Sequence, residues 1–135
     1  MVDGPVLIAR FEEVTNDVLD RTAKFPKHIR FTLSARIEER ALDVLEALVE
    51  ARYTRGKAKA QALARADAHL ARLRVLLRLA HTRQHLDHRA YAHVSLALDE
   101  CGRMLGGWRA QQVTAMNPAS HRPTGSEGAD PPWPA

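Results

Sequence analysis

The sequence contains one cysteine, few aromatic residues and no long uncharged apolar stretch. Cys101 is the only cysteine among 135 residues, which excludes an intrachain disulfide and is typical of a reducing compartment. No window approaches the roughly 18 uncharged apolar residues of a membrane-spanning helix. The first residues, MVDGPVLIAR, have neither the basic start nor the apolar run of a signal peptide. We therefore expect a cytoplasmic protein without a membrane segment.

The motifs of common catalytic and cofactor sites are also missing. There is no glycine-rich phosphate loop, no G-x-S-x-G, no H-E-x-x-H and no pair of C-x-x-C motifs. Cys101 lies on an apolar helical face, where a thiol is unreactive. His81 and His85 have a spacing that can hold Zn²⁺, but Asp87, the nearby carboxylate, is needed as a helix cap. We expect no catalytic residue, no metal, no cofactor and no enzymatic activity.

What the sequence does contain is a repeated helical pattern. It is rich in Ala, Leu and Arg, a composition that favours helix over strand. Apolar residues recur three and four positions apart in four stretches, and we call each such row a core seam. The predicted helices cover about residues 4–24, 33–53, 57–83 and 88–110. Their short connections predict an all-α fold, an up-down-up-down antiparallel four-helix bundle in one domain of residues 1–111.

Two polar residues are candidate helix caps, and one aromatic residue is a candidate core plug. Thr32 is placed to cap the second helix and Asp87 to cap the fourth. Trp108 closes the seam of the fourth helix, so we expect it in the core. Beyond the bundle, residues 112–135 contain five of the seven prolines and few apolar residues. Such a composition predicts a disordered C-terminal tail.

The third helix carries the basic character of the chain. It holds seven Lys or Arg residues and one acid, Asp67, whereas the whole chain has a net charge of +4. Its cations are Lys57, Lys59, Arg65, Arg72, Arg74, Arg78 and Arg83. The arginines are suited to bind phosphates, to pair with the acidic outer faces of the first two helices in a neighbouring subunit, or to form a solvated face. Spacing alone leaves these three alternatives open.

Two helices are apolar over more than one face. Outside the seams lie Val75, Leu76 and Leu79 in the third helix, and Leu42, Leu45 and Val49 in the second. A helix that is apolar on both sides in a small bundle needs a second packing partner. We interpret these six residues as an oligomer interface, and the alternative is a thick core with a solvated rim.

Four phrases resemble a known family. FPKHIRFTLSARIEE, ALDVLEALVEARY, RLRVLLRLAH and LDECGRMLGGW are similar to the accessory variability determinant proteins of diversity-generating retroelements. These belong to a broader four-helix bundle group that includes proteins encoded in bacterial ribosomal-RNA intervening sequences. The resemblance covers about residues 5–110, and the motif from Gly102 to Trp108 is its most specific part.

The resemblance implies a non-enzymatic homopentamer that forms a positively charged barrel. Such proteins associate with the retroelement reverse transcriptase and with template RNA or cDNA, and they support mutagenic cDNA synthesis. The family's basic positions match Arg74 and Arg78, with Arg72 beside them, and also Arg103. The turn QHLDHRAY departs from the Ser-Pro start that relatives often have, and the proline-rich tail has no counterpart. The alternative is a self-assembling bundle of the intervening-sequence type with a structural role and no polymerase partner.

Overall fold

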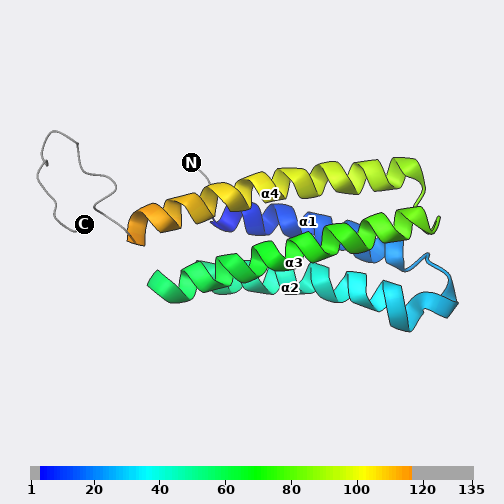
Figure 1. Cartoon of the computed structure of the whole chain (residues 1–135), viewed down its shortest axis with the longest axis horizontal. Coiled ribbons are helices and arrows are strands. Elements are labelled where there is room, and N and C mark those ends of the chain that lie inside the picture. The colour runs from blue at the N-terminus through cyan, green and yellow to red at the C-terminus, as the bar shows by residue number, and fades with distance from the viewer. Residues whose placement is uncertain (1–3, 117–135) are drawn as a thin grey trace, which may run out of the picture.

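The computed structural model describes residues 4–116, which form four long helices. They are α1 (Gly4–Thr22), α2 (Ala35–Arg52), α3 (Gly56–Thr82) and α4 (His88–Met116). Successive helices run in alternating directions along one long axis, and each packs against two others in the cyclic order α1, α2, α3, α4 (Figure 1). The described residues contain no strand. The predicted all-α four-helix bundle is confirmed.

The core is built from the seam residues that the sequence pattern predicts. Each helix contributes a row of almost fully buried side chains, and the rows meet along the bundle axis. The rows include Leu7, Phe11, Val14 and Val18 from α1, Ile37, Ala41, Val44 and Leu48 from α2, Leu63, Leu70, Leu73 and Leu77 from α3, and Val94, Leu98, Cys101 and Leu105 from α4. Because these rows repeat over several turns, they fix the rotation of each helix about its own axis.

Trp108 plugs one end of the core, as predicted. Its side chain is buried and lies against the first residue of α1, Gly4. A Cβ atom at Gly4 would lie 2.8 Å from Cη2 of Trp108, so the indole ring occupies space that only glycine leaves open. The ammonium group of Lys59 lies 5.6 Å from the centre of the same ring, within the range of a cation–π contact.

The connection between α1 and α2 is helical almost throughout, and we call residues 27–34 the elbow. A 3₁₀ turn (Lys27–Ile29) leads into a π-helical turn (Arg30–Ser34), which continues directly into α2. The predicted cap at Thr32 is therefore wrong. Its hydroxyl donates back to the carbonyl oxygen of Ile29 at 3.3 Å. The chain is already helical at this point, so there is no free helix start to cap.

The turn between α3 and α4 is held by backbone and side-chain hydrogen bonds. The N–H of His85 donates to the carbonyl oxygen of Ala80 at 2.9 Å, and Gln84 adopts the left-handed conformation with φ +67°. This arrangement is a Schellman motif with glutamine at the position usually taken by glycine. Oδ1 of Asp87 accepts a hydrogen bond from the N–H of Ala90 at 2.7 Å. The predicted cap of the fourth helix is confirmed.

The fourth helix extends beyond its predicted end at residue 110. It continues to Met116 because its last turns contact α3. Arg109 forms an ion pair with Asp67 at 2.9 Å, and Nε2 of Gln112 donates to the carbonyl oxygen of Gly56 at 3.2 Å. The remainder of the predicted tail, residues 117–135, lies outside the described residues, and the domain boundary at residue 111 stays a prediction.

Replacing Phe11 by alanine tests the position of the core. Phe11 is the largest fully buried side chain, so its truncation leaves a cavity between the helices. We expect Phe11→Ala to lower the free energy of unfolding by about 3–5 kcal/mol, measured by urea denaturation. Leu96→Ala on the exposed face of α4 is the control and should cost less than about 1 kcal/mol. Equal losses in the two variants would contradict the assigned core.

Candidate nucleic-acid and partner interface

The predicted cations of α3 differ in whether the protein itself provides a partner for them. Arg65 forms an ion pair with Glu50 of α2, and Arg74 forms one with Asp99 of α4. Lys59 lies over Trp108. These three cations connect α3 to its neighbours within the chain. Their pairing reduces the positive charge available to an external ligand.

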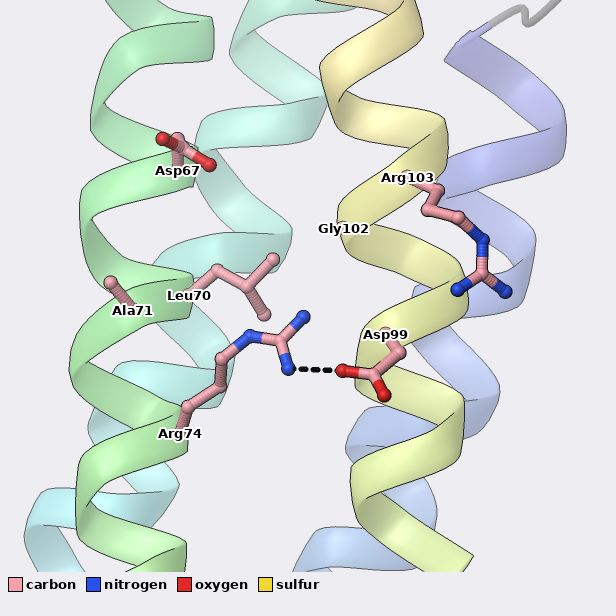
Figure 2. Close-up of a pocket in the computed structure, with 7 residues that line it drawn as sticks. All are labelled: Asp67, Leu70, Ala71, Arg74, Asp99, Gly102 and Arg103. Carbon is pink, nitrogen blue, oxygen red and sulfur yellow. Dashed lines mark hydrogen bonds and ion pairs between the residues drawn. The ribbon is translucent and has the colours of Figure 1, made fainter.

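Arg74 has the most defined surroundings of the predicted site residues. Its Nη1 donates to Oδ1 of Asp99 at 2.5 Å (Figure 2). Its Nη2 donates to the carbonyl oxygen of Leu98 at 2.9 Å. A Cβ atom at Gly102 would lie 2.8 Å from Nη2 of Arg74, so the absence of a side chain there lets the guanidinium reach α4. We call this arrangement of Arg74, Asp99 and Gly102 the clasp. This arrangement gives Gly102, the first residue of the motif that ends at Trp108, a structural role.

A pocket of about 390 Å³ lies beside the clasp, between α3 and α4. It is lined by two acids and two arginines, among other residues, so its charges balance. Asp67 pairs with Arg109, and Asp99 pairs with Arg74. Arg103 also lines this pocket, but its side chain points away from Arg74 (Figure 2). Arg103 is thus the one charged lining residue of this pocket without an ion-pair partner among residues 4–116.

The other predicted cations are exposed and have no ion-pair partner among residues 4–116. They are Lys57, Arg72, Arg78, Arg83 and Arg103. A guanidinium without an intrachain partner keeps its fork of N–H donors for a phosphate or a carboxylate. These five residues remain candidate contacts to nucleic acid or to a protein partner.

Two of these arginines border a groove between α2 and α3. One part, of about 390 Å³, is lined by Arg36, Arg40, Ala71, Arg72, Val75 and Leu76. The other, of about 510 Å³, is lined by Ile29, Phe31, Thr32, Leu33, Arg36, Leu79 and Arg83. Arg36 lines both parts, and we call them together the arginine-rimmed groove. Its floor is apolar and its edge is basic.

Sequence reasoning missed two residues of this groove. Arg36 lies outside the cluster of cations in the third helix, and its spacing from the α2 seam places it on a flank of α2. Phe31 lies in the predicted connection between the first two helices, and its large aromatic side chain is 86% exposed. An aromatic residue within a basic connection was the available signal, since such side chains are common at binding surfaces.

The predicted oligomer residues are exposed in part and fall on two separate surfaces. Val75 and Leu79 are 51% and 45% exposed and line the arginine-rimmed groove. Leu42 and Val49 are 41% and 40% exposed, and we call them the α2 patch. The other two predicted residues, Leu45 and Leu76, are half-buried and pack against the core.

The position of Glu38 shows that the α2 patch and the groove are distinct. Its Oε2 accepts a hydrogen bond at 2.6 Å from Oγ1 of Thr22 in α1, so this flank of α2 faces α1. Leu42 follows Glu38 by one helical turn and therefore shares that flank. Arg36, in contrast, lines the groove on the α3 side. The bundle thus has two non-equivalent apolar surfaces.

Two of the residues that the sequence analysis considered for catalysis or a metal, Cys101 and His81, have defined surroundings. Burial raises the pKa of the Cys101 thiol from 9.0 to about 11, so at neutral pH it stays protonated. His81 stacks on Tyr91, with ring centroids 4.4 Å apart. Between residues 4 and 116, no group of three or more His, Cys, Asp or Glu residues is placed to hold a metal ion. None of the described helices has the length and apolar character needed to cross a membrane.

Gly102→Ala tests the clasp. The new methyl group would displace the flexible end of Arg74, while alanine favours the helix by about 1 kcal/mol over glycine. We expect overall stability within about 1 kcal/mol of the parent. In a double-mutant cycle, the coupling between Arg74 and Asp99 should fall from about 0.5–1 kcal/mol to near zero, since both side chains are partly exposed.

Gly106→Ala is the matched control for this experiment. A Cβ atom at Gly106 would meet nothing within 4 Å, so this variant should gain helix stability and leave the Arg74–Asp99 coupling unchanged. If Gly102→Ala also preserved the coupling, Gly102 would not be the residue that admits the arginine.

Comparison with known proteins identifies the family. The bAvd-like family matches residues 5–112, which include nearly all of the four helices. No curated protein matches the chain significantly. The matched range includes the elbow and the motif from Gly102 to Trp108, so the predicted resemblance to accessory variability determinants is confirmed. Because this match covers most of the chain and the fold is a four-helix bundle, the chain belongs to the bAvd-like family of accessory variability determinant proteins.

Proposed function

We propose that this protein is a non-catalytic accessory component of a diversity-generating retroelement that acts in the cytoplasm. It assembles into a homopentameric basic ring, binds the reverse transcriptase and template RNA or cDNA, and supports mutagenic cDNA synthesis. Family membership supports the retroelement role and the pentamer. The observation that carries the proposal is the presence of two exposed apolar surfaces, one of them bordered by unpaired arginines.

Two different apolar surfaces favour a ring over a two-fold dimer. A two-fold dimer uses the same surface on both subunits, whereas a head-to-tail contact joins two different surfaces and closes when the rotation allows it. The charges at these surfaces are complementary. Arg36, Arg72 and Arg83 border the groove, and the exposed Glu39 and Glu46 lie one turn from Leu42 in the α2 patch. We therefore infer that the groove of one subunit receives the α2 patch of the next.

The ring acts as a scaffold. Several copies of one weak cationic site, held in a fixed arrangement, bind a long polyanion far more tightly than one copy does. Holding the polymerase and its template on the same assembly raises their effective concentration and positions the priming site. In this role the protein needs no reactive group of its own, which agrees with the protonated, buried Cys101.

Mixing two interface variants tests the head-to-tail contact. The first variant carries Val75→Glu and Leu79→Glu, and the second carries Leu42→Glu and Val49→Glu. Each variant keeps one of the two surfaces but lacks the complementary surface that it would bind. Light scattering should therefore find each variant monomeric. Their mixture should form a one-to-one pair through the remaining groove and the remaining α2 patch.

The outcomes separate a ring from other assemblies. Leu96→Glu, on an exposed part of α4 outside both surfaces, is the control and should remain oligomeric. A mixture that stays monomeric would contradict the head-to-tail contact, and variants that remain oligomeric would place the interface elsewhere.

Replacing exposed arginines tests nucleic-acid binding. We expect Arg78→Ala to weaken binding of a structured RNA and to lower the slope of log K against log salt by about 1 for each subunit that contacts the RNA, because each such subunit loses one phosphate contact. Helicity by circular dichroism should not change. Arg65→Ala is the matched control, since Arg65 already pairs with Glu50, and should affect the slope less.

The result for RNA also distinguishes the two partner classes. If the assembled protein binds RNA equally well with and without Arg78, this residue does not belong to the RNA site. An assembled protein that binds neither RNA nor the reverse transcriptase would contradict the proposal and favour a structural role of the intervening-sequence type.

A further inference from the structure

A separate pocket lies at the elbow and shares no lining residue with the arginine-rimmed groove. It is a pocket of about 450 Å³ between the end of α1 and the start of α2. Its lining residues are Thr22, Ala23, Phe25, Pro26, Lys27, Arg30, Ser34 and Glu38. The volume falls within the range typical of small-ligand sites. All but two of these residues belong to the phrase FPKHIRFTLSARIEE, and the proposed function assigns no role to the residues that line this pocket.

Ser34 is the unusual residue in this elbow pocket. It is 4% exposed, and its hydroxyl has no hydrogen-bond partner among residues 4–116. A serine in a regular helix commonly donates to the carbonyl four residues earlier, but here the preceding turn, Arg30–Ser34, is π-helical. A buried hydroxyl without a partner destabilises the fold. Because Ser34 lines the pocket, a ligand there is the natural partner for its hydroxyl.

The elbow pocket is lined by charged groups of both signs. Lys27 and Arg30 are exposed, and neither has an ion-pair partner in the part of the chain that the structure describes. Oε2 of Glu38 accepts from Thr22, whereas its Oε1 has no donor among the described residues. The site therefore offers two cations, one hydroxyl donor and one carboxylate acceptor. A fitting ligand carries an anionic group and a nearby hydroxyl.

We propose that the elbow pocket binds a ribonucleotide unit of RNA, through its phosphate and a ribose hydroxyl. Lys27 and Arg30 contact the phosphate, Ser34 donates to a phosphate oxygen, and Glu38 accepts from the ribose hydroxyl. The inference rests on the proposed function, in which RNA is a ligand of the assembly. It adds a site that distinguishes RNA from DNA, because only ribose carries the 2′-hydroxyl.

An acidic peptide fits the same pocket less well. Its side-chain carboxylates would satisfy Lys27 and Arg30 but would bring no hydroxyl donor to Glu38. The wall formed by Phe25 and Pro26 offers apolar contact to a sugar or a base. Mixed charge and an apolar wall together favour a nucleotide.

Titration of the full-length protein with adenosine 5′-monophosphate, followed by NMR, tests the proposal. We expect saturable binding, and binding of 2′-deoxyadenosine 5′-monophosphate that is about tenfold weaker because Glu38 loses its donor. Ser34→Ala should weaken binding of the ribonucleotide about fivefold or more. The same variant should be as thermally stable as the parent or more so, because the hydroxyl has no partner within the fold.

Two variants outside the pocket are matched controls. Ser95→Ala removes a half-buried hydroxyl from α4, and Lys24→Gln removes an exposed cation near Lys27. Both should bind the nucleotide as the parent does, whereas Lys27→Gln should bind it more weakly. This comparison separates a specific phosphate contact from general electrostatic attraction.

Several results would overturn the elbow site. These are no saturable binding, equal binding of the ribo and 2′-deoxy nucleotides, unchanged binding by Ser34→Ala, or displacement of the nucleotide by an acetylated Asp-Glu peptide. The last result would make the pocket a protein-docking site. If the protein assembles and binds long RNA through Arg78 but does not bind the nucleotide, only the proposal of the elbow site is contradicted. If the protein binds the nucleotide but does not assemble, only the proposed ring is contradicted.

Discussion

Burial of the α3 core seam sets the orientation on which the other features of this bundle depend. Leu63, Leu70, Leu73 and Leu77 must face the core, and this requirement fixes the rotation of α3 about its axis. Arg74 then faces α4 and meets Asp99, whereas Arg72 lies on the flank toward α2. The distinction between paired and unpaired cations is thus a consequence of apolar packing. The packing of the core therefore determines where the arginines lie.

This constraint also explains why the basic helix leaves charge for a partner. Arg65 and Arg74 are neutralised by neighbouring helices, and their ion pairs add specificity to the packing of α2 and α4 on α3. Such partly exposed pairs contribute little stability, about 0–1 kcal/mol each. The cations beyond reach of these acids border an apolar groove instead. Assembly through the groove would bring several sets of these cations together in one ring.

The sequence predicts the features that depend on periodicity or on neighbouring residues. Each seam repeats over several turns, so the buried rows and the plug Trp108 follow from spacing, and the Asp87 cap depends only on residues within one turn. Features that depend on contacts between helices were not predictable in this way. The pairing of Arg74 with Asp99 depends on the axial alignment of α3 and α4, and the π-helical turn that displaces the Thr32 cap depends on how α1 and α2 join.

The most direct test of the account is light scattering after size exclusion, at low and high salt, with and without a structured RNA. If apolar surfaces assemble the protein and expose its cations, the oligomer will have a mass near five chains of 15.1 kDa and will persist at high salt. RNA will bind to it at low salt and dissociate as salt rises. A 15.1 kDa monomer that ignores RNA at either salt concentration would contradict the account.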